Sequence, residues 1–217
     1  MSPRVQQPGR EDIPGDERHI WDEVAARFAR ARADRPEEVT FQGDAGPYFG
    51  ALLNSPPFAA VIAEYGRIAR TRGEHEGSYT HVDRELADQV IQFDWGWHGV
   101  QRTHIPDALA VGLRLEAIEA LRDGREQGLT GHERLIASYV RQVISGTVTD
   151  ESYAALAKEI GDRAAVEYTI FVAFLLMTLR LHQAFDVPAL TADEVDQMLG
   201  DFRAGRRKVP DARHRFG

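Results

Sequence analysis

The stretch AAVEYTIFVAFLLMTLRLHQAF, in the C-terminal third of the chain, is apolar on nearly every side of a helix. Such a helix is stable only when other helices surround it, from its own subunit or from a neighbour. Its longest apolar run, residues 168–179, has about 12 residues, against the roughly 20 that a membrane-spanning helix requires. Glu167 and Arg180 bound that run. We therefore predict a helical homo-oligomer, trimer or hexamer, with no membrane segment.

Helix-start signals recur along the rest of the chain. Thr80-x-x-Asp83, Thr130-x-x-Glu133 and Thr191-x-x-Glu194 resemble capping boxes, and Thr149 precedes two acidic residues. No segment shows the sustained two-residue alternation of a strand. The sequence predicts an all-α fold with helices near residues 19–33, 55–73, 81–94, 104–112, 113–124, 130–146, 149–161 and 162–185, and a last one opening at 191.

Composition limits the class of protein. With 217 residues, 43% hydrophobic and 28% charged, the chain is typical of one soluble globular domain. We predict a flexible N-terminal arm (1–18), a single helical domain (19–200) and a basic tail (201–217). The tail's arginines and lysine lack interleaved aromatic residues and are interpreted as solvated: Arg203, Arg206, Arg207, Lys208, Arg213 and Arg215.

Charge and residue usage exclude several functions. A net charge of −8 argues against nucleic-acid binding, which needs a basic face. The absence of cysteine excludes disulfides, thiolate metal sites and thiol nucleophiles. The N-terminus has no apolar core of the kind found in signal peptides, so we expect a cytoplasmic protein.

Residues 92–113, QFDWGWHGVQRTHIPDALAVGL, concentrate the chemically capable side chains. Asp94 falls inside the apolar arc of the preceding helix, so it either faces water at the helix end or has a function. Glu85 lies on that helix's polar side with Gln89 and Gln92, and the pattern alone predicts a solvated glutamate.

His104 shares a helix face with Ala108 and Val111, which fits either a core histidine or a catalytic one. Because Pro106 has no N–H, His104 is expected in the first turn, where the helix dipole favours a neutral imidazole. A neutral imidazole can act as a general base or donate to a developing oxyanion.

The neighbouring residues have two interpretations each. Trp95 and Trp97 are either core rings or walls that exclude water from a pocket. Arg102 is either a surface residue or a carboxylate anchor, because its planar fork matches two oxygens. The histidines at 75, 81, 98 and 104 lack zinc-ligand spacing and no HExxH motif appears, so we expect no metal.

The segments DRELADQVIQ and HIPDALAVGL resemble the carboxymuconolactone decarboxylase-like family, which includes the alkyl hydroperoxidase D-type enzymes. In that family an Arg-Glu-Leu helix start is followed, twenty residues after the Arg, by a histidine heading His-x-x-x-Ala-x-x-x-Gly-Leu. Arg84-Glu85-Leu86 and His104 have this spacing without a gap. LLNSPPFA and the segment from Gly146 to Pro188 extend the resemblance over roughly residues 47–190.

The resemblance implies an all-α, oligomeric bundle in which Glu85 and His104 form a proton relay. The family's two thiol positions fall on Trp97 and Val100, so a thiol peroxidase is excluded. FDWGWH also resembles the family's Phe-Glu-Trp-x-x-His, which would give His98 the histidine role; we prefer the gapless register with His104.

Two functions follow as expectations. The first is a cofactor-free lyase or isomerase acting on a small organic acid or lactone, with His104 moving the proton, Glu85 orienting it, Arg102 or Arg84 holding a carboxylate, and Trp95 and Trp97 excluding water. The alternative is a non-catalytic helical oligomer that binds a small ligand.

Overall fold

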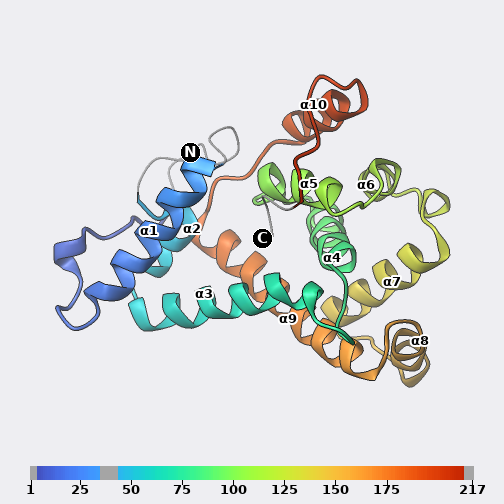
Figure 1. The fold of residues 1–217 in the computed structure, drawn as a ribbon, viewed down its shortest axis with the longest axis horizontal. Coiled ribbons are helices and arrows are strands. Elements are labelled where there is room, and N and C mark those ends of the chain that lie inside the picture. The colour runs from blue at the N-terminus through green and yellow to red at the C-terminus, as the bar shows by residue number, and fades with distance from the viewer. Residues whose placement is uncertain (1–3, 35–43, 213–217) are drawn as a thin grey trace. The chain divides into compact units, whose positions relative to one another are not determined.

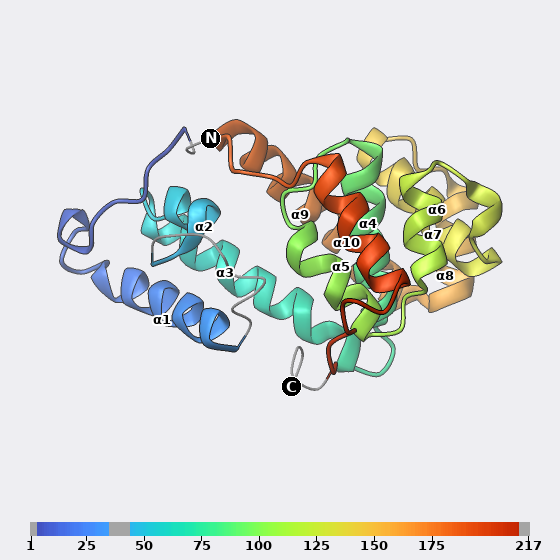
Figure 2. The same ribbon diagram turned by 90° about the horizontal axis from the view of Figure 1, so that it is seen from above.

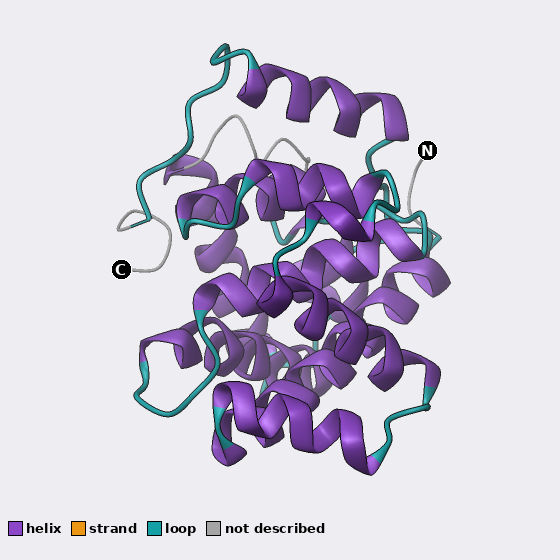
Figure 3. Cartoon of the chain, turned by 90° about the vertical axis from the view of Figure 1, so that its right-hand side faces the viewer, coloured by secondary structure: helices purple, strands orange, loops and turns teal. Residues whose placement is uncertain are grey.

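The structure is a computed structural model that describes residues 4–34 and 44–212. These residues form helices and loops, with one isolated bridge between His98 and Leu190 and no β-strand, so the predicted all-α class is confirmed (Figures 1 and 3). The α-helices are α1 (Arg18–Asp34), α2 (Gly46–Leu52), α3 (Pro56–Thr71), α4 (His81–Asp94), α5 (Gln101–Ala110), α6 (Leu115–Arg122), α7 (Gly131–Ser145), α8 (Asp150–Ile160), α9 (Asp162–Phe185) and α10 (Ala192–Arg203).

Side-chain caps set the beginnings of four helices. The hydroxyls of Thr80, Thr130, Thr149 and Thr191 each accept a hydrogen bond from the backbone N–H three residues later, at the starts of α4, α7, α8 and α10. Each cap satisfies a donor that the helix leaves unpaired. These starts agree with the threonine patterns in the sequence.

Helix α2 was not predicted. It has only seven residues, too few for a periodic apolar pattern to show, and Pro47 occupies its first turn. The sequence also predicts that Pro36 ends the first helix and that Gly43 belongs to the loop after it; both residues lie outside the described residues.

The chain divides into two compact units. The first comprises Met1–Ile68 and Leu179–Pro188, and the second comprises Ala69–Thr178 and Ala189–Gly217. Helices α3 and α9 each contribute residues to both units. The single domain predicted for residues 19–200 likewise extends over both units.

The first unit packs α1, α2 and the beginning of α3 around a small core of Val24, Ala45, Leu52, Leu53 and Ala59. Residues 4–17, expected to belong to a flexible arm, contact this unit. The backbone N–H of Arg4 donates to the carbonyl of Phe185 at 2.8 Å, Arg10 pairs with Asp22 at 2.6 Å, and Ile13 is 4% exposed.

The second unit is built around α4, which contacts α5, α6 and α7. Its apolar face, with Leu86, Ala87, Val90 and Ile91, is buried as the sequence predicts. Helix α10, red in Figure 2, packs against α6. In the predicted basic tail, Arg203 closes α10 and forms an ion pair with Glu119, so it is not a free solvated residue; Arg213 and Arg215 lie outside the described residues.

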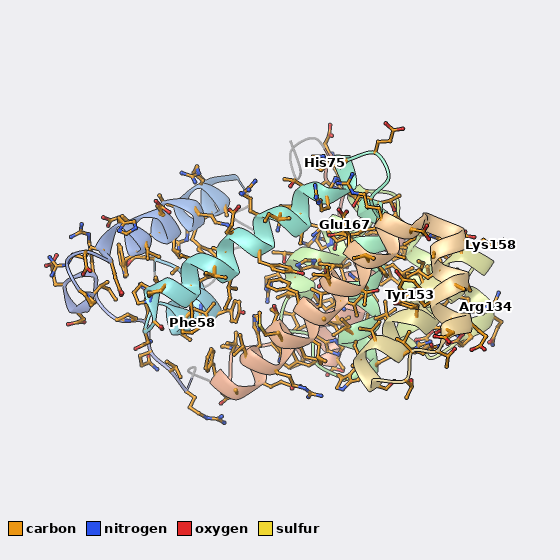
Figure 4. The ribbon with its side chains drawn as sticks, turned by 90° about the horizontal axis from the view of Figure 1, so that it is seen from below. Phe58, His75, Arg134, Tyr153, Lys158 and Glu167 are labelled. Atoms are coloured by element: carbon orange, nitrogen blue, oxygen red, sulfur yellow. The ribbon has the colours of Figure 1, made fainter. Side chains whose placement is uncertain are left out.

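Within the described part of the chain, α9 is the one helix long and apolar enough to cross a membrane, with a mean hydropathy of 1.7 over its most apolar window. Its inner side contributes to the second unit's core through Tyr168, Phe171 and Val172. Glu167, labelled in Figure 4, accepts a hydrogen bond from Ser78 at 2.5 Å and pairs with Arg72 at 3.2 Å. A core helix of a soluble protein meets the same length and hydropathy criteria, so these properties do not place α9 in a membrane.

Candidate functional site

A buried polar stripe runs along α4. Glu85, Asp88, Gln89 and Gln92 follow the i, i+3, i+4, i+7 spacing of one helix face, and each is at most 5% exposed. Helix α5 covers this face. The amide Nε2 of Gln89 donates to the backbone oxygen of His104 at 3.2 Å, and the oxygen of Gln92 accepts from the N–H of Val100 at 3.2 Å. The prediction that this side is solvated is wrong, because α4 is buried on both faces.

His104 faces two carboxylates of this stripe. Its Nδ1 lies 2.9 Å from Oε2 of Glu85 and 3.3 Å from Oδ2 of Asp88. The ring's Nε2 makes no hydrogen bond within the described residues, and the side chain is 16% exposed. The carboxylates therefore fix the ring through one nitrogen and leave the other able to meet a ligand.

Arg84 compensates the buried charge of Glu85. Its guanidinium forms a direct ion pair with Glu85, and both side chains are at most 4% exposed. Burial alone would raise the pKa of Glu85, but the positive charges of Arg84 and His104 outweigh it and lower that pKa to about 2. Glu85 is therefore ionised at neutral pH.

The charge of His104 differs from the sequence prediction. Burial would lower its pKa, but the negative charges of Asp88 and Glu85, the Glu85 hydrogen bond and the charge of Asp107 raise it to about 9. The resting ring is an imidazolium, not the neutral imidazole expected from its place in the first turn. Nearby carboxylates outweigh the helix dipole here.

Asp88 was not identified from the sequence as a site residue. Burial and the neighbouring charge of Glu85 raise its pKa to about 6, although His104 opposes the shift. It stands three residues after Glu85, a spacing that places both on one face. The sequence therefore contained a signal for Asp88 in its spacing from Glu85. That spacing indicates a site only when this face of α4 is known to be buried.

The free energy of unfolding is expected to depend on pH, because the pKa of His104 is higher in the folded protein than in the free side chain. Its pKa is about 9 in the folded protein against 6.5 for the free side chain. The stabilisation that the protonated His104 ring gives to the folded state is therefore complete below pH 6.5 and is lost as the pH rises through about 9. We expect the melting temperature to fall over this interval, and the ring protons of His104 to titrate well above pH 6.5 by NMR. Titration near pH 6.5 would contradict the assignment; Glu85→Gln is expected to move it downward.

The other predicted anchors lie elsewhere. Arg102 is two positions from His104 on α5, which places it on the opposite side of the helix. Its side chain is 37% exposed, and the guanidinium lies 3.9 Å from Glu194 of α10. Asp94 forms an ion pair with Arg141 of α7 at 2.6 Å, so it is a helix-end surface residue. No described contact joins either residue to His104, and Arg84 is engaged by Glu85.

Trp95, Trp97 and His98 belong to the loop between α4 and α5. Trp97 lies against Gly99: a Cβ added there would fall 1.7 Å from the indole ring, so only glycine fits. The backbone oxygen of His98 accepts from the N–H of Leu190 at 3.3 Å. Within the described residues no hydrogen bond connects these three side chains to Glu85 or His104.

Glu85, Asp88 and His104 offer donor atoms within 4.8 Å of one another, a geometry that also suits a divalent cation. Arg84 already pairs with Glu85, so a cation here would have to share that carboxylate with the guanidinium. The same contacts also suit proton transfer between His104 and its two carboxylates.

Comparison of the chain with protein-family models, with curated proteins and with solved structures finds no match.

Proposed function

We propose that the chain is a cofactor-free lyase or isomerase that performs acid–base chemistry on a small organic acid or lactone. One observation carries the proposal: the partly buried ring of His104 is held at one nitrogen by Glu85 and Asp88, while its other nitrogen makes no hydrogen bond in the described chain. The resemblance of Arg84-Glu85-Leu86 and of the segment from His104 to the carboxymuconolactone decarboxylase-like family points to the same pair.

In this proposal His104 acts first as an acid. Nε2 donates its proton to an oxygen or carbon on which negative charge develops, and the neutral ring then recovers a proton from the substrate or from water. Glu85 stays ionised and orients the ring, while Asp88 stabilises the charged form at 3.3 Å. The imidazolium also supplies the positive charge that an anionic substrate needs, which neither Arg84 nor Arg102 is placed to give.

The proposal is tested by screening small organic acids and lactones for turnover, with wild-type protein and a His104 variant compared on every hit. Turnover that depends on His104 supports the enzyme. Binding of such compounds without turnover favours the alternative, a non-catalytic helical oligomer that binds a small ligand.

We propose that the protein assembles with copies of itself through α9. The exposed apolar residues Val166, Ile170, Ala173 and Met177 follow the 4–3–4 spacing of a coiled-coil seam. Val166 and Ile170 are 49% and 52% exposed. An apolar stripe of this kind is typical of a surface that another helix covers.

Ile170→Glu is expected to dissociate the assembly, because a carboxylate in an apolar helix seam loses its hydration without gaining a partner. Size-exclusion chromatography with light scattering measures the change in mass. Val209→Glu, which alters an equally exposed valine outside α9 (52%), serves as the control and should leave the mass unchanged. A wild-type protein that is monomeric at micromolar concentration would refute the proposed assembly.

A further inference from the structure

A pocket lies at the C-terminal end of α4, within the second unit. Its volume is about 410 Å³, in the range that holds a small organic ligand. The α4–α5 loop, the end of α6 and the first turns of α10 form its walls. Eight residues line it: Phe93, Gly96, His98, Arg122, Asp123, Ala192, Val195 and Asp196. None of them belongs to the Glu85–His104 site.

The tryptophan- and glycine-rich loop shapes this pocket. Gly96 has a φ of +58°, a left-handed conformation that lets the chain turn sharply just after α4 ends. The bridge between His98 and Leu190 then ties the loop to the segment that leads into α10. The turn at Gly96 and the bridge at His98 thus give a structural role to loop residues that the Glu85–His104 site does not use.

One part of the pocket wall is apolar. The rings of Phe93 and His98 lie 5.6 Å apart at 58°, and Ala192 and Val195 line the α10 side. Burial lowers the pKa of His98, although the charge of Asp196 opposes the shift. The ring is therefore neutral at neutral pH and adds no charge to this wall.

The polar part of the wall belongs to an ion-pair network that Arg125, outside the lining, completes. Asp123 is fully engaged: Arg122 Nε donates to one oxygen at 2.7 Å and Arg125 Nη2 to the other at 2.5 Å. Arg122 Nη1 also donates to Oδ1 of Asp196 at 3.1 Å. Two arginines thus balance two aspartates.

This network leaves one donor and one acceptor on two side chains that a hydrogen bond joins. Within the described chain, Nη2 of Arg122 and Oδ2 of Asp196 make no hydrogen bond, and their side chains are 29% and 58% exposed. A guanidinium nitrogen binds a carboxylate, and a carboxylate oxygen accepts from an ammonium. In an α-amino acid both groups are attached to one carbon and are therefore also adjacent.

We propose that this pocket binds a free α-amino acid with an apolar side chain. The ligand's carboxylate accepts from Arg122 Nη2, its ammonium donates to Asp196 Oδ2, and its side chain packs against Phe93 and Val195. A zwitterion satisfies both Arg122 and Asp196, whereas a simple anion meets Asp196 and a simple cation meets Arg122.

Isothermal titration calorimetry on the full chain tests the proposal with leucine, methionine and phenylalanine, and with two analogues of leucine. 4-Methylpentanoate lacks the ammonium, and 3-methylbutylamine lacks the carboxylate. We expect at least one of the three amino acids to bind saturably. If leucine binds, the affinity of each leucine analogue should be lower than that of leucine by about tenfold or more. Absence of binding by all three amino acids, or an analogue that binds as tightly as leucine, would overturn the proposal.

Variants locate the binding. Arg122→Gln and Asp196→Asn should each weaken amino-acid binding about tenfold or more, and the ring signal of His98 should shift on addition of ligand only where binding persists. Asp193→Asn changes an exposed aspartate of the same helix outside the pocket and is the matched control. Equal affinity in wild type and both pocket variants would place the ligand elsewhere and refute the assignment.

Discussion

Replacing His104 with glutamine is expected to lower kcat/KM by about 10²–10⁴-fold on any substrate found in the screen, the range that one positioned acid–base group contributes. Glutamine keeps a polar side chain facing Glu85, but an amide N–H is not acidic enough to be transferred near neutral pH. Because the variant loses both the transferable proton and the positive charge that attracts an anionic substrate, kcat should fall and KM should rise. Steady-state kinetics measure the effect, with thermal melting to establish that the variant is folded.

Two controls sharpen this experiment. His75→Gln alters an exposed histidine, labelled in Figure 4, and should leave turnover unchanged. His98→Gln tests the alternative family register, in which His98 would be the functional histidine. Full activity of His104→Gln would refute its catalytic role, and loss confined to His98→Gln would transfer that role to the pocket lined by His98.

The helices were predictable because their signals are local. A threonine cap and a glycine such as Gly146, which ends α7 at a φ of +69°, act within a few residues of the chain. The seven-residue helix α2 and the division into two units depend on contacts between distant segments. No window of the sequence contains that information.

The site was only partly predictable. A helical wheel places Glu85 opposite the apolar arc correctly, but it does not say what covers the polar side. Only the packing of α5 against α4 turns a stripe that looks solvated into a buried one. For the same reason Asp88 was missed, since a second carboxylate on a solvated face has no special meaning.

The charge of His104 could not be predicted from its position in α5. A helix N-terminus disfavours an imidazolium by a fraction of a kcal/mol to about 2 kcal/mol. Two buried carboxylates within 3.3 Å act in the opposite direction and prevail. Arg102 failed as an anchor for a simpler reason, because side chains two positions apart on a helix point away from each other.

Truncating Glu85 to alanine is expected to cost about 3–5 kcal/mol of folding free energy, the usual penalty for leaving one member of a buried ion pair behind. Arg84 would lose its direct carboxylate partner where its side chain is only 4% exposed, and His104 would lose its 2.9 Å hydrogen bond. At roughly 2–4 °C per kcal/mol for a chain of this size, the melting temperature should fall by about 6–20 °C.

Glu64→Ala is the matched control, because Glu64 pairs with Arg67 at 2.6 Å while both side chains are more than half exposed. Such a pair contributes about 0–1 kcal/mol, so its loss should hardly change the melting temperature. If Glu85→Ala were equally mild, Glu85 would be neither buried nor paired as described.

The double variant Arg84→Met/Glu85→Leu separates charge from packing. Removing both charges together should cost less than Glu85→Ala alone, since the single variant removes the carboxylate that faces the buried Arg84 guanidinium.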